Sequence, residues 1–77
     1  MARWAPCKRA VFISKLVMLG FGPPEPGARH SYVRYRTHTL AIPGNPEYSV
    51  PQLRMLIREV EQIMGRKVSL REWQELS

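Results

Sequence analysis

Cysteine, aspartate and long apolar runs are scarce or absent in this chain of 77 residues. The single cysteine, Cys7, has no partner for an intramolecular disulfide, which excludes a disulfide-stapled secreted mini-domain and favours a reducing, cytoplasmic setting. All six acidic residues are glutamates, so a Ser/His/Asp catalytic set lacks its aspartate. The apolar run near the N-terminus, 11–13, ends before Lys15 without a small-x-small cleavage site, so we expect neither a signal peptide nor a membrane-spanning segment.

The basic charge is concentrated in one half of the chain. The net charge is +6 at neutral pH; residues 1–43 carry seven basic side chains and one glutamate, whereas residues 44–77 carry five of each sign. A chain this short forms one small domain, which buries only about 60% of its unfolded surface. The basic half favours a polyanionic partner such as nucleic acid, and solubility or an acidic protein partner is the alternative.

Apolar periodicity predicts helices at both ends of a single domain, residues 7–77, which follows a flexible arm at residues 1–6. A helical stripe of apolar residues with a glycine after it predicts a first helix over residues 7–19. A capping box at Ser49, with a proline in the first turn, predicts the start of a second helix, and another capping box at Ser69 predicts a short C-terminal helix.

Between these helices, alternating residues predict an antiparallel hairpin. Its strands are expected over residues 29–35 and 38–43, with a turn at Arg36-Thr37. The preceding stretch, 21–27, holds three prolines, which remove backbone donors, so we expect a stiff loop with at most a very short third strand. The fold class is therefore α+β: an α-β-β(-β)-α domain whose antiparallel sheet packs on two helices, plus the short C-terminal helix.

The first strand of this hairpin carries the candidate functional residues. Its period-two alternation places an imidazole, an aromatic ring and two cations on one face: His30, Tyr32, Arg34 and Arg36. Val33 is expected on the opposite side with Leu40 and Ile42, facing the helices, and the same alternation turns His38 that way. A paired acid/base role for the two histidines is therefore weak.

His30 allows two interpretations from the residues alone. Imidazole titrates near neutral pH and lies here among arginines, so it could take the proton of an RNA 2′-hydroxyl while Arg29 and Arg34 hold the phosphate. The alternative is a histidine without a catalytic role, either structural or merely exposed on the strand, and this is the commoner case. Tyr32 could stack on an RNA base or stabilise the sheet across strands, whereas for Tyr35 we favour the cross-strand role.

Metal chemistry is not expected from these residue types. Two histidines without a cysteine or an acidic cluster nearby make a poor metal site, because Cys7 is remote in sequence and Glu25 and Glu47 fall in loops. Glycine-rich phosphate loops and paired carboxylates suited to hydrolysis are also absent from the sequence. We therefore expect no metal and no other cofactor.

Several short motifs in a fixed order resemble the HicA toxins of type II toxin-antitoxin systems. The resemblance covers roughly residues 7–76 and is carried by Leu19-Gly20-Phe21, Gly27-Ala28-Arg29-His30, Leu40-Ala41-Ile42-Pro43, an Asn-Pro turn and the Ser49-Val50-Pro51 helix start. This order and spacing are far more specific than any one motif. Two departures are visible: the usual Gly-Ser-His is one residue longer here, and prolines interrupt the segment that forms a first strand in many members.

The resemblance implies a fold like the double-stranded-RNA-binding domain and a metal-independent mRNA interferase. It makes His30 the catalytic residue, Gly27 the glycine of the active-site turn, and Arg29 a neighbour that contacts phosphate. It also implies mRNA as the substrate and a HicB-like antitoxin as a protein partner that covers the site. A non-catalytic RNA-binding module and a protein-interaction domain remain alternatives that use the same basic face.

Overall fold

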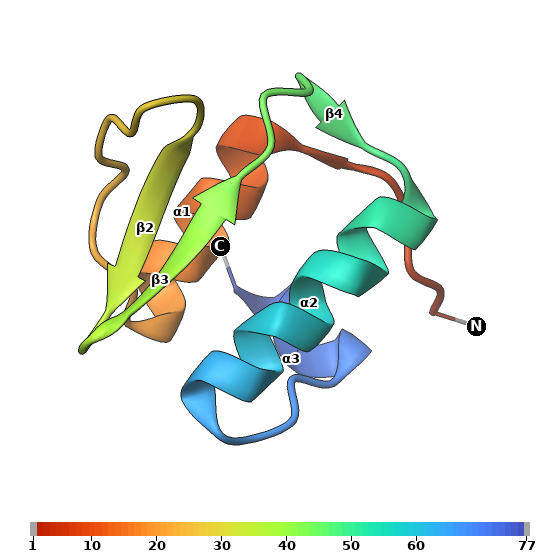
Figure 1. Cartoon of the computed structure of the whole chain (residues 1–77). Coiled ribbons are helices and arrows are strands. Elements are labelled where there is room, and N and C mark those ends of the chain that lie inside the picture. Colours follow the sequence, from red (N-terminus) through yellow and green to blue (C-terminus); the bar gives the residue numbers. More distant parts are fainter. Residues whose placement is uncertain (1, 77) are drawn as a thin grey trace.

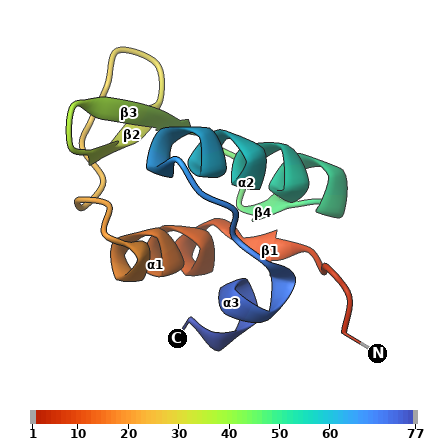
Figure 2. The same cartoon turned by 90° about the horizontal axis from the view of Figure 1, so that it is seen from below.

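The computed structural model describes residues 2–76, which form a small α+β domain. In chain order its elements are β1 (Cys7–Lys8), α1 (Arg9–Leu19), β2 (Ser31–Tyr35), β3 (His38–Ile42), β4 (Glu47–Tyr48), α2 (Val50–Met64) and α3 (Leu70–Glu75). Figures 1 and 2 show two layers, with the β2–β3 hairpin and α2 in one and α1 and α3 in the other. The predicted fold class, with its α-β-β-α order, is confirmed.

The helices begin and end at residues that satisfy their free backbone groups. The C-cap of α1 is Gly20, whose φ of 114° lies in the left-handed region that glycine adopts without strain. At the start of α2, Ser49 Oγ accepts from the backbone N–H of Gln52 at 3.4 Å. At the start of α3, Ser69 Oγ accepts from the N–H of Glu72 at 3.1 Å. Both predicted N-caps are therefore present.

The hairpin turns where the sequence predicts, and the structure defines its register, which the turn residues left open. Val33 pairs with Leu40, and Tyr35 pairs with His38 across the two-residue turn at Arg36-Thr37. Arg36 has a φ of 55°, the conformation that such a tight turn requires. The strands are shorter than the expected 29–35 and 38–43, because β2 begins at Ser31 and β3 ends at Ile42.

An isolated β-bridge borders β2 in place of the very short third strand that the sequence allowed. Glu25 and Tyr32 exchange both backbone hydrogen bonds, at 2.8 and 2.9 Å, and the N–H of Gly22 donates to the Arg34 carbonyl at 2.8 Å. The prolines on either side of Glu25 prevent the pairing from extending. This bridge brings Glu25 to the edge of the hairpin.

One apolar core joins the layers. The hairpin contributes Val33, Leu40 and Ile42, each at most 3% exposed, which is the inward face expected from the sequence. The largest buried side chains contributed by α1, β4 and α3 are aromatic. The rings of Phe12 and Tyr48 meet edge to face at 5.4 Å, and the buried ring of Trp73 lies with its centre 5.6 Å from that of Phe12.

A second two-stranded sheet, β1–β4, differs from the expected elements. Cys7 pairs with Tyr48, and Lys8 pairs with Glu47, so α1 starts at Arg9 rather than at residue 7. A pairing of two residues shows no period-two pattern; the buried ring of Tyr48 and its hydroxyl, which donates to the Pro43 carbonyl at 2.7 Å, hold it in place.

The N-terminal segment predicted as a flexible arm is partly tied to the domain. Trp4 is half-buried against the core, and the Arg54 guanidinium of α2 lies 5.0 Å from the centre of its ring. Met1 of this arm, like Ser77 at the other end of the predicted domain, lies outside the described residues.

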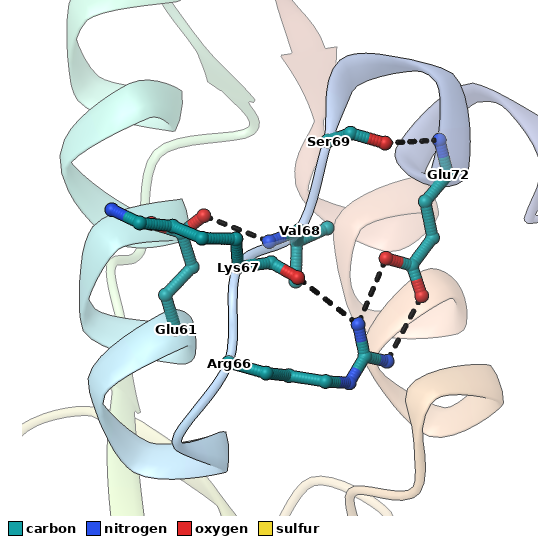
Figure 3. A network of polar contacts seen from close by, with 6 residues as sticks. All are labelled: Glu61, Arg66, Lys67, Val68, Ser69 and Glu72. Atoms are coloured by element: carbon teal, nitrogen blue, oxygen red, sulfur yellow. Dashed lines mark hydrogen bonds and ion pairs between the residues drawn. The ribbon is translucent and has the colours of Figure 1, made fainter.

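A polar network fixes the linker between α2 and α3 (Figure 3). The Arg66 guanidinium makes a bidentate pair with Glu72, with both N–O distances at 2.9 Å, and also donates to the Lys67 carbonyl at 3.1 Å. Glu61 of α2 accepts from the backbone N–H of Val68 at 2.8 Å. Since Glu61 belongs to α2 and Glu72 to α3, the network ties the linker to both helices and holds the short C-terminal helix against the domain.

Candidate nucleic-acid interface

The open face of the β2–β3 hairpin carries a shallow hollow of ≈ 480 Å³. Residues from the loop and from both strands line it: Gly27, Ala28, His30, Tyr32, Arg34, Thr39 and Ala41. The fold thus brings together four of the residues proposed from the sequence, and the small side chains of the alanines and the glycine leave the hollow open. We call this feature the sheet hollow.

Gly27 shapes the bend that brings His30 to the sheet hollow. A Cβ atom at this position would lie 2.3 Å from the carbonyl oxygen of His30 and 3.4 Å from the Tyr32 ring. The first distance is shorter than any that a real Cβ atom tolerates, and the obstacle is backbone rather than a flexible side chain. The chain can therefore fold back so closely here because residue 27 has no side chain.

His30 lies in this bend rather than in the strand. The expected strand start at residue 29 is wrong, because the chain is bent over residues 28–30 and becomes extended at Ser31. The side chain is exposed at the hollow, and within residues 2–76 no hydrogen bond or ion pair engages its imidazole. Its ring nitrogens are thus accessible to a ligand that occupies the hollow.

Tyr32 and Arg34 form a polar cluster with a residue that sequence reasoning did not connect to the site, Glu25. The Tyr32 hydroxyl donates to Glu25 Oε1 at 3.2 Å, and Arg34 Nε lies 3.5 Å from Glu25 Oε2. The Arg34 guanidinium also lies over the Tyr32 ring, 5.6 Å from its centre, and donates to its hydroxyl at 3.5 Å. The charge of Arg34 is therefore partly offset by a carboxylate.

The other proposed residues lie elsewhere. Arg36 occupies the hairpin turn and packs over Tyr35 at 5.5 Å, and it does not line the sheet hollow. Tyr35 itself packs on Phe21 at 5.1 Å, so its ring has a structural contact with the loop before the hairpin rather than the favoured contact across the strands. Arg29 is exposed in the bend but does not line the hollow. His38 follows the inward alternation, yet it is exposed at the turn end of β3, where that alternation does not bury it.

The thiol of Cys7 is buried and does not line the sheet hollow. Burial raises the pKa of Cys7 and Glu47 adds to the rise, while the charge of Lys15 lowers it. A buried thiol with a raised pKa is a poor nucleophile and a poor metal ligand. No group of three potential metal-ligating His, Cys, Asp or Glu side chains occurs within the residues that the structure describes.

The elements of residues 2–76 include no helix with the length and apolar character to cross a membrane.

The sheet hollow is an open, partly basic surface with one exposed imidazole, one aromatic ring and one arginine. Such an arrangement can bind a phosphate through the arginine, stack a base and accept a proton at the imidazole. Comparison with family models, curated proteins and solved structures found no match for this chain.

Proposed function

We propose that this protein is a HicA-like toxin, a metal-independent endoribonuclease that cleaves mRNA at the sheet hollow. The observation that carries the proposal is the bend at Gly27, whose tight approach sets the exposed imidazole of His30 beside Tyr32 and Arg34. The ordered motifs on both sides of this bend, and the basic charge of residues 1–43, support the same conclusion.

In the proposed reaction His30 acts as the general base. Its imidazole accepts the proton of an RNA 2′-hydroxyl, the 2′ oxygen attacks the adjacent phosphorus, and the bond to the 5′ oxygen breaks. The products are a 2′,3′-cyclic phosphate end and a 5′-hydroxyl end, with the second proton supplied by water. Arg34 binds the phosphate and stabilises its developing charge, and the exposed Arg29 contacts the strand beside it. Tyr32 provides a ring on which a base can stack.

The proposed partners follow from the same surface. The sheet hollow is open to solvent, so it is accessible to a protein partner that covers it. A HicB-like antitoxin, as implied by the resemblance, is such a partner. The lone, buried Cys7 agrees with the proposed cytoplasmic location, where thiols stay reduced.

A non-catalytic RNA-binding module is the second candidate. It is favoured by the presence of both Tyr32 and Arg34 in the sheet hollow, because aromatic rings beside basic side chains are typical of surfaces that hold single-stranded RNA without cutting it. A domain that only docks an acidic protein would use the same basic face and would not bind RNA even at low salt.

The proposed reaction can be tested with purified protein and a single-stranded RNA in the presence of EDTA. We expect cleavage that persists in the chelator and fragments that end in a cyclic phosphate. RNA binding without any cleavage would select the binding module instead. Absence of both at low salt would indicate the protein-docking alternative.

A further inference from the structure

Glu25 occupies the very donors that a phosphate would use in the sheet hollow. Its two carboxylate oxygens face the Tyr32 hydroxyl at 3.2 Å and Arg34 Nε at 3.5 Å. Phosphates and carboxylates are bound by the same donor groups, and arginine and tyrosine are common among them. In the free protein, therefore, the anion position beside Arg34 is filled by a side chain of the chain itself.

The Glu25–Arg34 contact joins the basic site to the one acidic residue in the basic half of the chain. Glu25 is the one acidic residue among residues 1–43, which carry seven basic side chains. Glu25 could pair with a cation at many places in such a basic half, yet it lies against the arginine that lines the hollow. The local charge of the site is thus lower than the composition of this half indicates.

The backbone holds Glu25 at this position, while its side chain is free to leave. Glu25 and Tyr32 exchange two backbone hydrogen bonds, at 2.8 and 2.9 Å, so the main chain stays in place when the carboxylate moves. The side chains of Arg34 and Glu25 are 50% and 41% exposed. An ion pair this exposed contributes little free energy, so an incoming anion can displace the carboxylate by a side-chain rotation.

We propose that Tyr32 and Arg34 form a subsite for an RNA phosphodiester and that Glu25 fills it in the free protein, as a built-in competitor that limits RNA affinity. This inference rests on the proposed function, since the competing anion is the RNA substrate. Binding of the strand breaks the Arg34–Glu25 pair, and the phosphate oxygens then take both donors.

The effect of removing the competitor can be bounded. Glu25→Gln keeps the shape of the side chain and an oxygen that can accept from Tyr32, but it removes the charge. An ion pair between exposed side chains is weak, and the repulsion between an exposed carboxylate and a phosphate is weakened by water, so we expect RNA affinity to rise about three- to tenfold at low salt. Because both contributions are electrostatic, the gain in affinity should shrink as the salt concentration rises.

The experiment measures fluorescence anisotropy with a labelled single-stranded RNA whose sugars are 2′-O-methylated, so that it cannot be cleaved. Glu47→Gln is the matched control, because it makes the same change in net charge at an exposed residue of the other sheet. We expect Glu25→Gln to bind more tightly and with a steeper salt dependence than Glu47→Gln. In an Arg34→Ala background the gain from Glu25→Gln should be smaller, since the guanidinium for which carboxylate and phosphate compete is gone.

The outcomes separate this inference from the proposed function. If the wild type binds RNA and Glu25→Gln binds equally or less tightly than Glu47→Gln, Glu25 anchors the site instead of competing for it, and the inference is wrong while the proposed function stands. If the wild type and both variants fail to bind RNA at low salt, the proposed function is wrong and the inference with it.

Discussion

Replacement of Gly27 by alanine tests how tightly the fold positions His30. The added Cβ would lie 2.3 Å from the His30 carbonyl oxygen, against 3.4 Å or more for an ordinary contact, so the two backbone segments must separate by about 1 Å. The bend is exposed at the surface, where it can relax, so we expect a loss of about 1 kcal/mol in the free energy of unfolding. A displacement of this size at a reacting group lowers the rate by about 10²-fold.

Gly44→Ala is the matched control, because a Cβ at Gly44 would have no atom within 4 Å. The two assays are urea unfolding followed by tryptophan fluorescence and the rate of RNA cleavage. We expect Gly27→Ala to remain folded and to lose most of its cleavage, with Gly44→Ala close to the wild type in both. If Gly27→Ala cleaves RNA within about twofold of the control, the tight bend does not position a reacting group and our reasoning is refuted.

Three further predictions concern the rest of the fold. The Arg66 guanidinium holds the pKa of Glu72 below its ordinary value of 4.5. The ion pair therefore stabilises the fold above pH 4.5, and this stabilisation is lost as the pH falls through the lowered pKa of Glu72. The difference in urea midpoint between the wild type and Glu72→Gln should close in acid and stay open at neutral pH. Tyr48→Phe removes the 2.7 Å hydrogen bond to Pro43 and should lower the free energy of unfolding by about 1 kcal/mol, and an unchanged urea midpoint would contradict this. Burial raises the pKa of Cys7, so its thiol should react with a disulfide reagent only as fast as the protein opens, and labelling at the rate of an exposed thiol would contradict the burial of Cys7.

The elements that were predictable are those with a repeating pattern or a specific cap. The apolar stripe and Ser49 N-cap of α2, and the alternation of Val33 against Leu40, appear in the structure as the sequence indicates. Each pattern reports the period of a regular backbone, so it can be recognised without knowledge of the tertiary fold. The same alternation placed Tyr32 and Arg34 together on the open face.

What the sequence did not predict depends on contacts between distant segments. The β1–β4 pairing is two residues long and is held by the burial of Tyr48. No local sequence pattern predicts that burial. Glu25 lies in a proline-rich loop, and its carboxylate reaches Arg34 only because the loop runs along β2. A basic strand with one glutamate in the loop before it was the signal that could have pointed to this contact. The position of Arg36 was missed because a tight turn redirects its side chain.

The central claim is that His30 is the proton-accepting group of an RNA-cleaving site, and His38 provides an internal comparison. Both side chains are exposed, so replacing either by alanine should change the free energy of unfolding by less than about 0.5 kcal/mol. The decisive measurement is the cleavage rate of single-stranded RNA by these two variants beside the wild type. We predict that His30→Ala lowers the rate by about 10²- to 10⁴-fold and that His38→Ala leaves it unchanged. Cleavage by folded His30→Ala at the wild-type rate would contradict the proposed site.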